Sequence, residues 1–251
     1  MSGSTSRTMS AAAVTAAIDR NIAHSVWRAN QMGSYQAAVT PTGHPALDRE
    51  LPNGGWPAST LIELLLQQAG IGEMRLLQPA LSAIGQQRRI ALVQPPHLPL
   101  AAAWAGWDIP ADRFLWLKTA RTADALWSAE QILRNGSCGA LLFWQPQIRT
   151  EALRRLHLAA QGSTTVFWML RPLSAAEHAS PAPLRLALRP AAAGVSVDIV
   201  KRRGPVAERP FYIALAQDAA LSSTHPRIDH APVDRHALAA VAPRSVSAAL
   251  V

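Results

Sequence analysis

The stretch from residue 63 to residue 77, ELLLQQAGIGEMRLL, decides the fold class of this chain. An apolar run ends at two glutamines, a short loop carries Gly70 and Gly72, and a helical pattern begins at Glu73. A buried strand that leads through a glycine-containing loop into a helix is typical of a phosphate-binding loop in an α/β protein. Where such a loop carries a lysine, this chain carries Glu73. The stretch therefore predicts a nucleotide-binding architecture and raises the question of whether its chemistry survives.

The residues on either side of this stretch continue the alternation of strand and helix. Near-continuous apolar runs predict strands at residues 60–66, 89–94, 114–118, 138–145 and 164–170. Periodic apolar positions predict helices at residues 73–85, 121–135 and 151–161. Apolar strands separated by helices indicate a mostly parallel sheet that is covered on both faces.

The pattern changes after residue 183. Residues 184–190 and 194–203 alternate apolar and polar side chains, which predicts a half-exposed antiparallel hairpin. In this hairpin Arg185 and Arg189 are expected to face water. Residues 210–215 add one more predicted strand.

The two ends of the chain differ from its centre. Residues 1–34 predict an N-terminal helix and linker, because a drifting apolar stripe runs through 9–32. Residues 35–216 form the predicted core. Residues 217–251 are rich in Ala, Ser, His, Pro and Arg without a sustained stripe, and this composition predicts a basic, mostly disordered tail.

The composition limits the functional classes. The net charge is +8, and only two of the 24 basic residues are lysines. Such an excess favours an acidic partner such as DNA, although a codon bias toward arginine explains it equally well. The single cysteine, Cys138, excludes a disulfide framework or a cysteine metal cage within the chain. We find neither a signal peptide nor an apolar run of membrane-spanning length, so we expect a cytoplasmic protein without a membrane partner.

Six motifs, one of which contains the stretch 63–77, carry a resemblance to a known family. They are TGHPALDRELPNGGWP (42–57), LIELLLQQAGIGEMRLLQPAL (61–81), VQPPHLP (93–99), TADALWSAEQILRNGSCGALLFW (122–144), LRRLHLAA (153–160) and IVKRRG (199–204). As a set they resemble the RecA recombinase core and, more closely, the RecA-like ImuA family, over about residues 35–215. The resemblance implies a RecA-like core and a role in damage-induced (SOS) translesion DNA synthesis. It also implies an ImuB-type, polymerase-like partner and RecA as a second partner.

Three positions argue against nucleotide hydrolysis. Glu73 replaces the phosphate-binding lysine, and two like charges about 4 Å apart repel by about 4 kcal/mol at an effective dielectric of roughly 20. Gln145 ends the fourth strand where a magnesium-binding acid is needed, and the residues around Pro96 offer no carboxylate to orient water. We therefore predict a degenerate nucleotide site at Gly70, Gly72, Glu73, Pro96 and Gln145. We expect no catalytic residue, no cofactor and no metal, and an active ATPase stays open only if the loop is aligned with a one-residue gap.

Binding to DNA is the function that we expect of the arginines. In a RecA-like core the loops after the fourth and fifth strands face the DNA, and here they are residues 145–155 and 171–183. Together with the hairpin they provide the predicted DNA-binding residues Arg149, Arg154, Arg155, Arg171, Arg185, Arg189, Lys201, Arg202 and Arg203. An ordinary solvated surface is the alternative for the arginines of the first loop, because exposed arginine pairs are common.

A second function is compatible with the same fold. SulA-type cell-division inhibitors are similarly RecA-like, lack the nucleotide site and bind the tubulin-like division protein. Their chains are shorter and less basic than this one, which favours the ImuA resemblance. Binding to the division protein or to the polymerase-like partner discriminates between the two.

Overall fold

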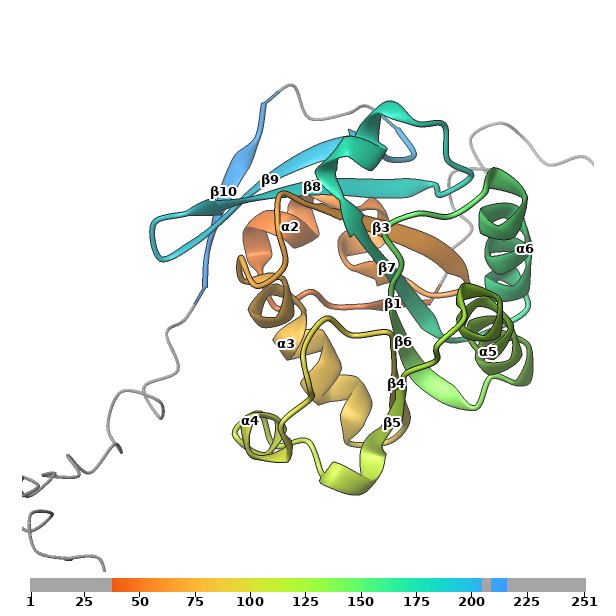
Figure 1. The fold of residues 1–251 in the computed structure, drawn as a ribbon. Helices are drawn as coiled ribbons and strands as arrows, with labels where there is room; N and C mark the ends of the chain where they lie inside the picture. The colour runs from red at the N-terminus through yellow and green to blue at the C-terminus, as the bar shows by residue number, and fades with distance from the viewer. Residues whose placement is uncertain (1–37, 205–208, 216–251) are drawn as a thin grey trace, which may run out of the picture. The chain divides into compact units, whose positions relative to one another are not determined.

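The architecture was analysed in a computed structural model that describes residues 38–204 and 209–215. One eight-stranded sheet organises these residues (Figure 1). Its strands are β3 (Thr60–Leu66), β4 (Arg89–Val93), β5 (Phe114–Leu117), β6 (Cys138–Trp144), β7 (Val166–Pro172), β8 (Leu184–Ala191), β9 (Gly194–Lys201) and β10 (Phe211–Ala214). Across the sheet they follow the order β10-β9-β8-β3-β7-β6-β4-β5. The six strands from β8 to β5 are parallel, and β9 and β10 are antiparallel to their neighbours. The predicted mostly parallel sheet with a C-terminal antiparallel hairpin is confirmed.

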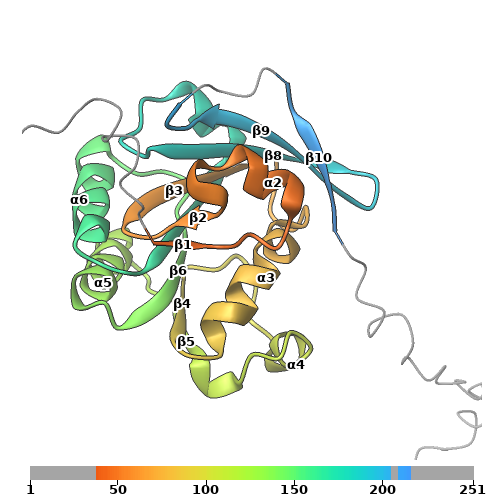
Figure 2. The same cartoon turned by 180° about the vertical axis from the view of Figure 1, so that it is seen from behind.

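Helices cover both faces of this sheet. Helix α3 (Glu73–Gly85) lies on one face together with α4 (Ala101–Ala105), and α5 (Thr122–Asn135) and α6 (Thr150–Gln161) lie on the other (Figures 1 and 2). The predicted stripe of α3 is buried at Leu76, Leu77, Ala80 and Leu81. On the opposite face the buried residues of α5 and α6 are Ala125, Ala129, Glu130, Ile132, Leu133, Leu153, Leu156, Ala159 and Ala160. Two separate apolar layers therefore hold the sheet in place.

The segment that precedes β3 is more structured than its turn residues indicate. It forms β1 (Val39–Thr40), α2 (Pro45–Glu50), the 3₁₀ helix η1 (Pro52–Gly54) and β2 (Trp56–Pro57), with β1 and β2 paired antiparallel. Trp56 is fully buried and packs edge-on against Trp168 of β7, with 5.7 Å between the ring centroids. The segment thus closes the α3 side of the core.

The predicted exposure of Arg185 in β8 is wrong, whereas Arg189 is exposed as predicted. Residues 184–188 are all buried, Arg185 included, although their sequence alternates. The reason is that β8 lies inside the sheet between β3 and β9, and the 3₁₀ helix η3 (Leu173–Glu177) covers the face that Arg185 occupies. Strand β9 does alternate between buried and less buried residues, as predicted.

Some predictions concern residues outside the described ranges. The helical stripe at 9–32, the N-terminal segment 1–34, the end of the core at residue 216 and the tail 217–251 all lie there wholly or in part. Within residues 38–204 and 209–215, every helix is too short or too polar to cross a bilayer.

Candidate functional site

The loop between β3 and α3 follows the carboxyl end of a strand in the parallel part of the sheet, which is where α/β proteins bind ligands. Gly70 has a φ of 83° and Gly72 a φ of 113°, and both values belong to the left-handed region that favours glycine. Gly72 is also the N-cap of α3. The two glycines that the sequence analysis selected therefore shape the loop.

The Glu73 carboxylate is bound inside this loop. The backbone N–H of Gly70 donates to both carboxylate oxygens, with N–O distances of 2.9 Å to Oε1 and 3.1 Å to Oε2. The Glu73 residue is only 3% exposed. A carboxylate in the first turn of a helix is favoured by the helix dipole, as a bound phosphate would be. The chain thus supplies its own anion to the loop, and an incoming phosphate would meet a negative charge.

The carboxyl end of β10 closes the loop from another side. A Cβ at Gly72 would lie 2.7 Å from Cδ1 of Leu215 and 3.3 Å from Cγ1 of Val195 in β9. Leu215 is 5% exposed, and its N–H donates to the carbonyl oxygen of Ala193, 3.0 Å away. This contact joins positions 143 residues apart (215 − 72) and has no signal in the sequence, so sequence reasoning missed it.

An apolar pocket of about 290 Å³ adjoins the loop. Its lining residues are Gly70, Glu73, Met74, Leu92, Pro95, Pro96, His97, Leu98, Pro99, Leu100, Ala103, Trp104, Trp107 and Trp144. Glu73 is the only acid among them, and lysine and arginine are absent from the lining. The wall offers no cation to pair with a phosphate.

The residues of the predicted nucleotide site are partly brought together. Gly70, Glu73 and Pro96 line one pocket, and Gly72 lies beneath Leu215. Gln145 directly follows β6, and its side-chain amide donates to the carbonyl oxygen of Gln147 at 2.7 Å. Within the described ranges, His, Cys, Asp and Glu form no group of three that could hold a metal ion.

Two of the predicted DNA-binding residues are buried ion-pair partners. Glu63 of β3 is fully buried; Nη1 of Arg171 contacts one of its oxygens at 2.8 Å and Nε of Arg185 contacts the other at 2.5 Å. Arg185 also donates to the carbonyl oxygens of Ala175, Ala176 and His178, at 2.6, 3.3 and 3.2 Å. Arg185 is 5% exposed with its donors engaged, so the prediction that it faces water is wrong, and its contact with DNA stays a prediction. A buried carboxylate requires such partners, and the lone acid in the apolar run TLIELLL was the signal that sequence reasoning missed.

The other predicted DNA-binding residues differ in their exposure and in whether an acidic side chain pairs with them. Arg149, Arg154, Arg155, Lys201 and Arg203 are exposed. Arg155 is paired with Glu130 of α5, and Arg189 lies 3.9 Å from Asp198. The Arg202 side chain is 15% exposed and contacts the Glu50 carboxylate at 2.9 Å, which holds it against α2.

Lys201 and Arg203 lie close to α6, and we refer to them as the basic pair. Partial burial lowers the pKa of His157 on α6, and the positive charges of Lys201 and Arg203 lower it further. The basic pair therefore lies near enough to α6 to act on the charge state of His157. Neither residue has an acidic partner among the described residues.

Comparison with known proteins gives partial similarities. The chain is 29% identical over 98 residues to the cell division inhibitor SulA of Edwardsiella piscicida, which covers 39% of this chain and 58% of that protein. It is 25% identical over 124 residues to the cell division inhibitor SulA of Serratia proteamaculans, which covers 49% of this chain and 74% of that protein. The chain is similar to SulA over part of its length. It spans less than two thirds of the Edwardsiella protein, and no family model matches it.

Proposed function

We propose that this chain is a non-catalytic, RecA-like accessory protein of the SOS response that acts in translesion DNA synthesis by docking on partner proteins. The observation that carries the proposal is the pair formed by Glu73 and Gly70. A loop whose amide already binds a buried carboxylate cannot accept a phosphate unless that pair opens. The scaffold is then available for binding rather than for turnover.

The rest of the pocket supports an inert site. Hydrolysis of a nucleotide requires cations around the phosphates, an acid that holds Mg²⁺ and a group that orients water. Gln145 stands at the end of β6, and Pro95, Pro96 and His97 follow β4. None of these four side chains is a carboxylate, so the proposal excludes an ATPase.

The proposed partners follow from the ImuA resemblance and from the surface charges. An ImuB-type, polymerase-like protein and RecA are the protein partners, and DNA is a further partner. The exposed Arg149, Arg154 and basic pair are the groups that we assign to DNA phosphates, because they are accessible to an anion. The partial similarity to SulA is consistent with an SOS-related role.

A second candidate function rests on that same similarity. Both reported relatives are cell division inhibitors, so inhibition of division through the tubulin-like division protein is the alternative. A degenerate nucleotide site is compatible with either function. The two functions differ in the protein that the chain binds: the polymerase-like protein and RecA in the first, the division protein in the second.

The test is a quantitative binding experiment with the purified full-length chain. Its affinity for the polymerase-like protein, for RecA and for the division protein is measured by biolayer interferometry at equal salt. We expect binding to the polymerase-like protein and to RecA, and no binding to the division protein. Binding to the division protein alone would replace the first proposal with the second.

Nucleotide binding is measured in parallel by equilibrium dialysis of labelled ATP with and without Mg²⁺. We expect no saturable retention in either condition. Magnesium-dependent retention with turnover would remove the basis of both functions.

A further inference from the structure

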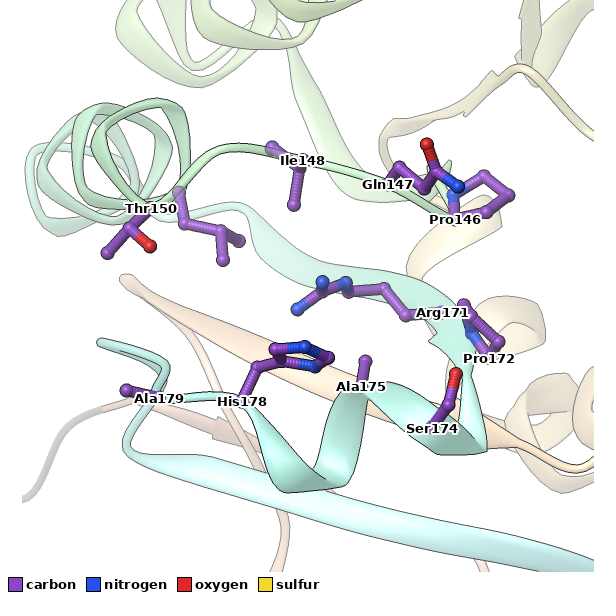
Figure 3. A pocket seen from close by; sticks show the side chains of 11 residues that line it. Pro146, Gln147, Ile148, Thr150, Arg171, Pro172, Ser174, Ala175, His178 and Ala179 are labelled. Carbon is purple, nitrogen blue, oxygen red and sulfur yellow. The ribbon is translucent and has the colours of Figure 1, made fainter.

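A second pocket, of about 420 Å³, lies at the carboxyl ends of β6 and β7 and shares no lining residue with the pocket beside the β3–α3 loop. It is lined by the loop that leads into α6 and by η3 with the residues after it (Figure 3). The lining residues are Pro146, Gln147, Ile148, Thr150, Leu153, Arg171, Pro172, Ser174, Ala175, His178 and Ala179. None of them belongs to the degenerate nucleotide site.

Arg171 is the charged group of this pocket. It is 7% exposed, and Figure 3 shows its guanidinium group between the segment that carries Ile148 and the ring of His178. Its only hydrogen bond with the described chain runs from Nη1 to Glu63, and its buried Nε has no acceptor there. A guanidinium group has five N–H donors, so most of its hydrogen-bonding capacity is unused.

The local charge is unbalanced. The two guanidinium groups of Arg171 and Arg185 face the single carboxylate of Glu63. Arg185 is satisfied by three backbone carbonyl oxygens in addition to Glu63, whereas Arg171 is not. Since the pocket lining contains no acid, the two guanidinium groups share one carboxylate, and one positive charge remains without a counterion beside the pocket.

We propose that this pocket binds one carboxylate presented by a partner protein, the side chain of a glutamate or aspartate. A guanidinium group binds a carboxylate through two parallel hydrogen bonds, and the hydroxyl groups of Thr150 and Ser174 line the same space. The walls formed by Pro146, Ile148 and Pro172 suit the aliphatic stem of an acidic side chain. This inference deepens the docking function proposed above and rests on it for the existence of a protein partner.

A protein carboxylate fits this pocket better than nucleic acid does. Binding to a phosphate backbone uses several cations along a groove, and single strands stack their bases on aromatic side chains. The pocket offers one buried arginine beside His178, and Phe, Tyr and Trp are absent from its lining. The exposed basic pair lies outside it.

The test uses the full-length chain and two small probes in an NMR titration. The first probe is N-acetylglutamate N-methylamide, and the uncharged control probe is the corresponding glutamine compound. We expect the Arg171 Nε–H signal to shift saturably with the acid, with a dissociation constant of about 1–10 mM, and to stay unchanged with the amide. That signal is assigned by its loss in Arg171→Met.

A second variant keeps the test valid if Arg171→Met fails to fold because Glu63 loses a partner. Ser174 is exposed and lines the pocket, so Ser174→Glu places a carboxylate there within the chain itself. We expect Ser174→Glu to weaken binding of the acid at least about tenfold. The matched control is Ser174→Gln, which has the same size without the charge and is expected to bind the acid as the unchanged chain does.

Each remaining outcome overturns the inference. A signal that does not saturate, or equal binding of the acid and the amide, would show that Arg171 is not a carboxylate site. Binding of a short oligothymidylate at lower concentration than the acid, abolished by Ser174→Glu, would assign the pocket to nucleic acid instead. If the acid binds as expected but no partner protein does, the pocket stands and the docking function fails.

Discussion

The Glu73 carboxylate and the Gly70 amide form a hydrogen-bonded pair inside the β3–α3 loop, at 2.9 and 3.1 Å. The pair spans three residues, so it forms as soon as the loop and the first turn of α3 fold. The same amide is the kind of group that binds a phosphate in nucleotide-binding proteins. The acid at position 73 thus brings a negative charge to the loop and also occupies the amide that would bind an anion.

The first prediction concerns this pair. Glu73→Ala leaves the Gly70 N–H without its buried acceptor and is expected to lower the free energy of unfolding by about 1–3 kcal/mol. Chemical denaturation measures the change. The control is Glu151→Ala, since Glu151 is also an acid in the first turn of a helix but is exposed. We expect a loss of at most about 0.5 kcal/mol for the control, and equal losses would contradict a specific role of the pair.

The second prediction separates strain from steric contact in the same loop. Gly70→Ala meets no atom within 4 Å, so it costs only the left-handed backbone conformation, about 1–2 kcal/mol. Gly72→Ala pays that cost and also clashes with Leu215, which adds about 1–3 kcal/mol. Denaturation of both variants measures the difference.

A double-mutant cycle checks the assignment to Leu215. In a Leu215→Ala background, the cost of Gly72→Ala is expected to fall toward that of Gly70→Ala, because the Cδ1 atom that a new Cβ meets at 2.7 Å is gone and only the looser contact with Val195, at 3.3 Å, remains. An unchanged cost of Gly72→Ala in that background would mean that β10 does not cover the loop.

The third prediction compares the loss of stability when each of the two arginine partners of Glu63 is replaced. Arg185 donates one hydrogen bond to Glu63 and three to carbonyl oxygens, whereas Arg171 donates one in all to the described chain. Removing one member of a buried ion pair costs about 3–5 kcal/mol, and we expect Arg185→Met to lie at or above this range and Arg171→Met below Arg185→Met. Thermal unfolding of both variants gives the order. The reverse order would contradict the unequal satisfaction of the two guanidinium groups.

The fourth prediction concerns the basic pair. Lys201→Glu together with Arg203→Glu is expected to weaken binding to single-stranded DNA and to reduce the slope of log K against log salt by about 1.4, since each lost phosphate contact removes about 0.7. Fluorescence anisotropy across a salt titration measures the slope. Arg75→Glu on α3 is the control, because Arg75 is exposed and belongs to a different element from the basic pair, which lies at and after the end of β9. A slope that changes equally in the control would attribute binding to net charge alone.

The sequence predicted the sheet and its helices because their signals are local. The apolar runs of β3 and the stripe of α3 depend on residues a few positions apart, and both elements have their predicted bounds. The burial of Arg185 could not be predicted, because it depends on η3 lying over β8 and on a buried acid in β3. An alternating sequence shows that apolar and polar side chains point to opposite faces of a strand. Whether the polar face is exposed to water depends on which elements pack against it.

In the candidate site, too, one feature could be predicted from the sequence, and the contacts that depend on tertiary structure could not. Glu73 was predicted to oppose a phosphate by its charge, and this required only its position in the motif. That it binds the Gly70 amide, and that Leu215 covers Gly72, depends on coordinates of side chains and on a strand far along the chain. The pocket at Arg171 has a similar origin, since it needs two loops and the unequal pairing of two arginines.

The last prediction concerns the pH dependence of stability through His157. Burial of this side chain, followed by the charges of the basic pair, lowers its pKa in the folded chain below the unfolded value of about 6.5. Its Nδ1 atom is buried without an acceptor or donor among the described residues. Below about pH 6.5 the unfolded chain therefore binds more protons at this position than the folded chain does, and stability falls as the pH decreases.

His157→Gln removes this linkage, so the free energy of unfolding is expected to fall less steeply between about pH 6.5 and 5 than in the unchanged chain. Lys201→Gln together with Arg203→Gln removes only the electrostatic part and is expected to reduce the slope partially, because burial is the larger cause. Denaturation at several pH values measures each slope, and Arg75→Gln, which removes one positive charge on α3, is the control for the loss of a basic residue elsewhere. A slope that is identical in the unchanged chain and in His157→Gln would show that protonation of His157 does not contribute to the acid sensitivity of the fold.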